Sequence, residues 1–370
     1  MRRIKSYRIW EKEGNLTSVQ INFLNRYVTG SWTMNPEGLV DVEGDFDCSG
    51  RGIKSLMGIR FGSVRGNFHC YWNQLTSLEG APQEVRMNFD CSGNQLTSLK
   101  GAPREVGEGF HCYGNQLTSL EGAPREVIGY FYCYRNQLTS LEGAPREVRG
   151  NFDCRWNQLT SLGGAPREVR GDFDCHSNQL TSLKGAPREV GGGFYCSENQ
   201  LTSLEGAPRE VRGNFHCYRN QLTSLEGAPQ EVGGNFDCSE NQLTSLEGAP
   251  REVRGNFDCS YNQLTSLEGA PREVSGDFYC MDNQLISLEG ATRDVGGNYY
   301  FSDNPVSVET LNKIISAMEA NPEMGYGAIL ASLQSRIPQE DWEKLDKSSL
   351  DKMNQSRKRV YGMLGGIGGI

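Results

Sequence analysis

The residue types with the most potential for chemistry here are cysteine and histidine, and both follow a rule of spacing. Eleven of the twelve cysteines fall 21 residues apart, from Cys70 to Cys280, and Cys48 precedes them one residue out of step. Each of the four histidines stands directly before or directly after one of these cysteines. Thiols and imidazoles in such proximity could act as nucleophiles, as redox groups or as metal ligands.

The pattern argues against all three chemistries. No two cysteines have the C-x-x-C spacing of zinc and thioredoxin-like sites. A phenylalanine stands two residues before almost every cysteine, which predicts buried, free thiols that behave as small apolar groups and fit a reducing compartment. His69, Asp90 and His111 share one column and could hold a metal ion, but cross-strand charge pairing is the simpler interpretation. The sequence therefore predicts a protein that is not an enzyme and has no metal or cofactor.

A 21-residue repeat must position these residues, and residues 255–275 are one copy of it. Phe257 and Cys259 alternate with polar residues, which predicts a strand with one buried face. Gly-Ala-Pro follows later in the copy and favours an extended return leg over a helix. A fixed period of this size predicts a mainly β solenoid, in which 21-residue coils stack into a parallel strand ladder. The columns expected in its core contain Phe257, Cys259, Leu264, Leu267 and Val274 and their equivalents.

An asparagine recurs three residues after each cysteine from Asn73 to Asn283, and Asn304 takes the same place in the last copy. The strand bends there, and buried backbone groups that leave a ladder need other partners. A side-chain amide both donates and accepts hydrogen bonds, so we expect each asparagine to bind neighbouring coils at once.

These residues resemble the leucine-rich repeat family, whose pattern is L-x-x-L-x-L-x-x-N-x-L. Phe89, Cys91, Asn94 and Leu96 match it, whereas Val85 stands four residues before Phe89 instead of three, which suggests a bulge at the strand's start. The helix-poor repeat looks like the short bacterial-effector type, and the phrases NQLTSLEGAP and GNFDC look like repeat proteins of tailed bacteriophages and bacteria. The resemblance covers roughly residues 44–304. It implies a binding scaffold and names no ligand.

The sequence divides into three parts. Residues 1–43 do not repeat, and apolar residues between Leu16 and Val28 predict a short helix, with Thr17 or Ser18 as its cap and Gly30 as its stop, in an N-terminal cap. Residues 44–304 form the solenoid. Residues 305–370 have helical periodicity and then a glycine-rich end, which predicts a helical C-terminal cap and a flexible tail.

The net charge of −9 comes from the repeats, which argues against binding to a nucleic-acid backbone. Arginine and glutamate recur side by side on the return leg, as in Arg104 and Glu105, and we interpret them as a solvated edge whose charges compensate one another. The N-terminus does not resemble a secretory signal, and no run reaches transmembrane length. We therefore expect a cytoplasmic location without membrane contact, or a virion if a phage encodes the chain.

The repeats vary most at positions that point outward from the strand. Drift at unburied positions is one explanation. The other is a recognition surface, because tyrosine, tryptophan, arginine and histidine supply much of the energy of protein interfaces. The candidate surface comprises His69, Tyr71, Trp72, His111, Tyr113, Tyr132, Tyr134, Arg135, Arg155, Trp156, His176, Tyr195, His216, Tyr218, Arg219, Tyr261 and Tyr279.

Three functions are compatible with such a surface. We favour a non-enzymatic scaffold that binds a macromolecule, most simply a protein. A virion or tail component of a phage, or a filament protein that self-associates through its termini, is the second hypothesis. A glycan-binding adhesin is the third, because aromatic side chains also suit sugars.

Overall fold

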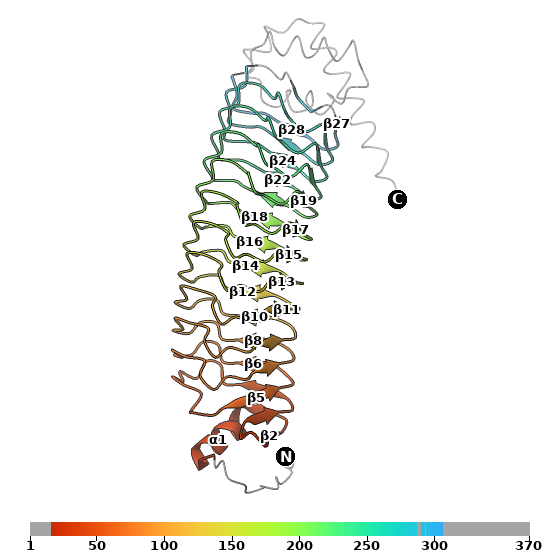
Figure 1. Cartoon of the computed structure of the whole chain (residues 1–370). Coiled ribbons are helices and arrows are strands. Elements are labelled where there is room, and N and C mark those ends of the chain that lie inside the picture. The colour runs from red at the N-terminus through yellow and green to blue at the C-terminus, as the bar shows by residue number, and fades with distance from the viewer. Residues whose placement is uncertain (1–15, 287–289, 293, 306–370) are drawn as a thin grey trace, which may run out of the picture.

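The computed structural model describes residues 16–286, 290–292 and 294–305. They form an elongated solenoid in which successive coils stack along one axis (Figure 1). Equivalent residues of consecutive coils are paired in parallel, as Phe131 is with Phe152, so the register advances by 21 residues per coil. The predicted solenoid of 21-residue coils is thereby confirmed.

Two ladders of fourteen strands each run the length of the described solenoid, and we name them after the side chain that each buries. The phenylalanine sheet comprises β1 (Val28–Thr29), β4 (Asp45–Asp47), β6 (Phe68–His69), β8 (Phe89–Asp90), β10 (Phe110–His111), β12 (Phe131–Tyr132), β14 (Phe152–Asp153), β16 (Phe173–Asp174), β18 (Phe194–Tyr195), β20 (Phe215–His216), β22 (Phe236–Asp237), β24 (Phe257–Asp258), β26 (Phe278–Tyr279) and β28 (Tyr299–Tyr300). The valine sheet comprises β2 (Trp32–Met34), β3 (Val40–Val42), β5 (Phe61–Val64), β7 (Glu84–Val85), β9 (Glu105–Val106), β11 (Glu126–Val127), β13 (Glu147–Val148), β15 (Glu168–Val169), β17 (Glu189–Val190), β19 (Glu210–Val211), β21 (Glu231–Val232), β23 (Glu252–Val253), β25 (Glu273–Val274) and β27 (Asp294–Val295).

The second ladder corrects two details of the sequence interpretation. The return leg is not merely extended, because its Glu-Val pair is a strand in its own right. The extra residue between Val85 and Phe89 is therefore not a bulge within one strand. It belongs to a bend that joins β7 of the valine sheet to β8 of the phenylalanine sheet.

The N-terminal end contains the expected helix. α1 (Ser18–Tyr27) begins after a capping box, in which the Thr17 side chain accepts from the Gln20 backbone N–H and the Gln20 side chain accepts from the Thr17 N–H. β1 and β2 then pair antiparallel with β4 and β3, whereas every later neighbour is parallel. This reversed segment occupies the first edge of both sheets, which would otherwise expose unpaired backbone groups.

The core consists of the predicted columns. The Phe, Cys and two Leu positions are fully buried in coil after coil, and the Val position is nearly so. From Phe68 to Phe257 the phenylalanine rings stack with centroids 5.3–5.5 Å apart. All twelve cysteines are free and buried. Each coil is too thin to bury these groups alone, so the stacking of neighbours creates the core.

The asparagine column binds neighbouring coils together, as predicted. The Asn157 amide nitrogen donates to the carbonyls of Cys154 in its own coil and Cys133 in the preceding one, at 3.0 and 3.2 Å. Its oxygen accepts from the Leu138 N–H at 3.0 Å. The same contacts recur along the ladder, so each buried amide satisfies backbone groups where the strand ends.

Two further expectations concern the chain ends and membranes. The predicted C-terminal helices and tail lie outside the described residues. Within the part of the chain that is described, no helix has the length and apolarity to cross a bilayer.

Candidate recognition surface

Three outward positions of each coil form the surface of the phenylalanine sheet. The first lies between Phe and Cys, and its side chains are mostly half-buried between their neighbours. The second directly follows Cys. The third follows next and projects furthest, with Trp72 69% exposed, Tyr261 56% and Trp156 40%. The candidate residues therefore all lie on one face, with exposure that increases along the strand.

The third position has a left-handed backbone in nearly every coil. It is occupied by glycine at Gly50, Gly93 and Gly114, and the remaining coils place bulkier residues there at φ of 50–56°, except in the last coil, where φ is 58°. These residues are Trp72, Arg135, Trp156, Ser177, Glu198, Arg219, Glu240, Tyr261, Asp282 and Asp303. A left-handed non-glycine residue costs about 1 kcal/mol or more. The fold thus tolerates strain at the position whose side chain is most accessible.

Eight of the candidate residues form one continuous group over four coils, which we call the aromatic cluster: His111, Tyr113, Tyr132, Tyr134, Arg135, Arg155, Trp156 and His176. His111 stacks on Tyr132 with ring centroids 5.0 Å apart, and Tyr113 stacks on Tyr134 at 4.3 Å. Trp156 meets Tyr134 edge-on at 6.4 Å and His176 at 5.5 Å.

Two guanidinium groups lie against the indole of this cluster. The Cζ atom of Arg135 is 4.6 Å from the Trp156 ring centroid, and that of Arg155 is 4.8 Å away. Arg155 also lies 5.1 Å from the Tyr134 ring centroid. Contacts of this kind are favourable when a cation faces the ring within about 6 Å. The cluster therefore combines flat apolar surface with fixed cationic donors.

Two carboxylates lie close to Arg155 and form ion pairs with it. The Nε atom of Arg155 lies 3.1 Å from Asp153, and its Nη1 atom lies 3.9 Å from Asp174. These two aspartates are paired directly across neighbouring strands. His176 Nδ1 is 2.7 Å from an Asp174 oxygen, so a second basic group flanks the acidic pair. Like charges side by side would destabilise the sheet, and the basic neighbours offset that cost.

Burial and charge shift the titration of this group. Burial, and then the neighbouring Asp174, raises the pKa of Asp153 to about 7. The hydrogen bond that the imidazole of His176 donates to the Asp174 carboxylate raises the pKa of His176 above its ordinary value. By contrast, burial lowers the pKa of His216, which lies three coils from Asp153. The aromatic cluster thus lies against a carboxyl group, Asp153, whose pKa is near neutral pH.

The other candidate residues are not part of this cluster. His69 contacts Tyr71, and Tyr195 contacts His216, which contacts Tyr218. Tyr279 stacks on Tyr300 further along the same face. Arg219 bridges Glu198 and Glu240 at 3.3 and 2.9 Å, so its charge is already paired. Trp72 and Tyr261 project without a ring contact within the described residues.

The column of His69, Asp90 and His111 is not gathered around a metal. His111 Nδ1 lies 3.6 Å from Asp90, which agrees with charge pairing across the strands. No group of three histidine, cysteine or acidic side chains among the described residues is arranged to hold a metal ion. Burial raises the pKa of the Cys154 thiol and of its equivalents well above the usual value, which opposes thiolate chemistry.

Sequence reasoning omitted several members of the surface. Asp153 and Asp174 position Arg155, yet their types alone suggest only adjacent like charges. Tyr130 stacks on Tyr132 at 5.6 Å and is 48% exposed, although it occupies a position that is usually asparagine, aspartate or glycine. That departure from the repeat is the signal that could have identified it.

Comparison with known proteins finds solved structures of similar fold. No family model matches the sequence, and no curated protein is similar to it. Solved structures with a similar fold include YopM from Yersinia enterocolitica (18% identity, covering 72% of each chain, TM-score 0.41) and YopM, a leucine-rich effector protein from Yersinia pestis (19% identity, 71% of this chain and 78% of that one, TM-score 0.44). A functional domain of InlJ from Listeria monocytogenes, described as including a cysteine ladder, is also similar (18%, 70% and 68%, TM-score 0.37). The resemblance to phage-encoded repeats stays a prediction.

Proposed function

We propose that this chain is a non-enzymatic scaffold that binds a protein partner through the aromatic cluster of the phenylalanine sheet. The observation that carries the proposal is the stacking of Arg135 and Arg155 on Trp156, with Arg155 also against Tyr134. Tryptophan, tyrosine and arginine are the residues most often found at the energetic centre of protein interfaces.

Preorganisation supports this proposal. Asp153 and Asp174 fix Arg155 before any partner arrives, so binding loses little side-chain entropy there. Trp156 and Arg135 also stand at left-handed positions, where Gly93 and Gly114 show that glycine is compatible with the fold.

The free donors of Arg135 indicate the chemistry of the partner. No carboxylate of the described residues lies within 4 Å of its guanidinium, in contrast to Arg155 and Arg219. A planar guanidinium that is already stacked on an indole suits a bidentate contact with a carboxylate. We therefore expect the partner to place an acidic side chain beside an apolar or aromatic one.

The test compares two tryptophans at equivalent positions. Trp156 lies in the cluster and Trp72 does not, yet both are exposed and left-handed. The full chain, Trp156→Ser and the control Trp72→Ser would be immobilised, and proteins retained from a lysate of the natural source quantified. A genuine partner is expected to lose at least tenfold in affinity with Trp156→Ser and to be retained by Trp72→Ser.

Two results would contradict the proposal. Equal retention of the partner by both variants would show that the aromatic cluster does not take part in recognition. Retention that survives protease treatment of the lysate and is competed by polysaccharide would favour the glycan-binding alternative. Circular dichroism of both variants would establish that they are folded.

A further inference from the structure

The valine sheet presents two columns of opposite charge, a continuous one of glutamates and one of arginines that Gln230 interrupts. Its glutamates are paired in register across neighbouring strands, as Glu147 is with Glu168 and Glu168 with Glu189. The residue before each glutamate is an arginine in eight coils, and all of these side chains are exposed except Glu168, which is half-buried. The arginine column comprises Arg104, Arg125, Arg146, Arg167, Arg188, Arg209, Arg251 and Arg272.

Few ion pairs involve these columns within the chain, so the edge that the sequence suggested is solvated rather than closely paired. Among the described glutamates of this column, ion pairs within 4 Å form only at Glu84, with Arg86 at 3.7 Å, and at Glu168, with Arg170 at 3.1 Å. The arginines of the column make none among the residues that the structure describes. Like charges one strand apart repel one another, so the glutamate column lacks its complement.

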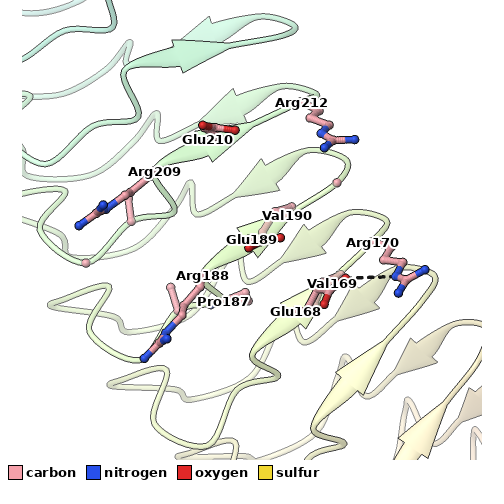
Figure 2. Close-up of a pocket in the computed structure, with 14 residues that line it drawn as sticks. Glu168, Val169, Arg170, Pro187, Arg188, Glu189, Val190, Arg209, Glu210 and Arg212 are labelled. Carbon is pink, nitrogen blue, oxygen red and sulfur yellow. Dashed lines mark hydrogen bonds and ion pairs between the residues drawn. The ribbon is translucent and has the colours of Figure 1, made fainter.

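The columns line a groove with a volume of about 960 Å³. Figure 2 shows Glu168, Glu189 and Glu210 along the strands, with Arg188 and Arg209 on one side and Arg170 and Arg212 on the other. Gly191 is the equivalent residue of the coil between those of Arg170 and Arg212. Because glycine has no side chain, the groove is open at this point. The arginine column thus forms a ridge beside an acidic floor.

We infer that this face binds a second copy of the chain. The partner's charges must repeat at the strand spacing, which is about 4.8 Å per coil. An extended peptide presents side chains on one face every ~6.6 Å and loses register within two coils. A second copy has the same spacing along its whole length, so its arginine ridge can follow the glutamate floor coil by coil.

Symmetry fixes the arrangement of the two copies. A two-fold axis parallel to the solenoid axis, placed between the two columns, brings the arginine ridge of each copy over the glutamate floor of the other. A two-fold axis along the strands would instead place arginine against arginine. The proposed dimer is therefore parallel, with two arginine–glutamate contacts per coil.

The dimer is expected to be sensitive to salt. Exposed ion pairs contribute little individually, and the association depends on many of them acting together. Because exposed charges are screened at high ionic strength, the dissociation constant is expected to rise at least tenfold between about 50 mM and 500 mM salt.

Analytical ultracentrifugation of three full-length forms tests the inference. Arg188→Glu with Arg209→Glu makes both columns acidic in two coils, and Glu189→Arg with Glu210→Arg makes them basic. Each variant alone is expected to self-associate at least tenfold more weakly than the unaltered chain. An equimolar mixture of the two is expected to regain association as a heterodimer, because acidic columns then face basic ones.

The control is Glu226→Arg with Glu247→Arg, which makes the same change in net charge at exposed residues outside the valine sheet. It is expected to associate like the unaltered chain. The inference is overturned if the unaltered chain is monomeric at low salt, if the variants associate normally, or if the mixture stays monomeric. Normal association in the variants would assign self-association to another surface, such as the chain ends.

Discussion

The two sheets of this solenoid are built on the same coils, yet their outer surfaces follow opposite rules. The valine sheet repeats Glu in ten successive coils, whereas the position between Phe and Cys alternates among Asp, His and Tyr. Both surfaces share one strand spacing and one core. The packing therefore does not dictate the difference between the two outer surfaces.

The two left-handed positions of each coil differ in the same way, because one is always glycine and the other varies. Gly143 and its equivalents are always glycine, because a Cβ at Gly143 would lie 2.6 Å from the backbone of the preceding coil. At Gly114 a Cβ would meet nothing closer than 3.5 Å. The third outward position, to which Gly114 belongs, thus accepts Trp156 and Arg135 at the cost of local strain alone.

The largest expected effect distinguishes the phenylalanine column of the core from the valine column. Phe152→Ala should destabilise the protein by about 3–5 kcal/mol, because a ring stacked between two others leaves a cavity. Val148→Ala in the valine sheet removes two carbon atoms and should cost about 2 kcal/mol. Urea unfolding followed by circular dichroism would compare them. Equal losses would show that the phenylalanine column is no more important than the valine column.

The next effect uses pH to probe the carboxylates beneath the aromatic cluster. Because the pKa of Asp153 is raised to about 7, the folded state binds a proton more tightly than the unfolded state. Stability should therefore fall as pH rises from about 4 to 7. His176 changes stability in the same direction, since its raised pKa contributes stability below about 6.5 that is lost as pH rises through the folded pKa.

Asp153→Asn removes this dependence with little change in shape. At pH 8 the variant should be more stable than the unaltered chain by about 2–4 kcal/mol, and at about pH 4 the two should converge. Thermal unfolding at several pH values measures both. A variant that is less stable at pH 8 would mean that the Arg155 contact outweighs the burial of the Asp153 charge.

Much of this architecture could be predicted, because it depends on short-range alternation repeated many times. Phe257 and Cys259 alternate with polar neighbours, and the period stacks each column on itself. The second ladder was missed because Val85 is the only buried residue around its strand, whereas the alternation of Phe257 and Cys259 continues beyond their two-residue strand. Its existence depends on pairing with the next coil, which sequence alone does not display.

The candidate surface was predicted as a face but not as a cluster. The 21-residue register alone places Tyr113 beside Tyr134. The position of the Arg155 side chain depends instead on two carboxylates and on the side-chain rotamers of neighbouring coils. The left-handed backbone at Trp156 could have been inferred from glycine at Gly50, Gly93 and Gly114 in the same column. Neither side-chain packing between coils nor backbone strain is visible from the residue types of one coil alone.

A smaller effect should have opposite signs on the two surfaces. Trp72→Gly relieves a left-handed tryptophan that is 69% exposed, and it should stabilise the fold by about 1 kcal/mol. Glu147→Gly places glycine within a strand of the valine sheet and should destabilise it by about 0.5–1 kcal/mol. Chemical denaturation of both variants checks the signs. Destabilisation by both would show that Trp72 contributes more packing than its exposure suggests.

The smallest expected effect concerns the charges of the valine sheet. Arg170→Gln breaks the 3.1 Å ion pair with Glu168, and it should change the stability of the monomer by less than about 0.5 kcal/mol because Arg170 is exposed and Glu168 is only half-buried. Denaturation at a protein concentration low enough to dissociate any dimer, and at low salt so that the ion pair is not screened, isolates this contribution. A loss above about 1 kcal/mol would mean that this ion pair stabilises the fold more than an exposed pair normally does.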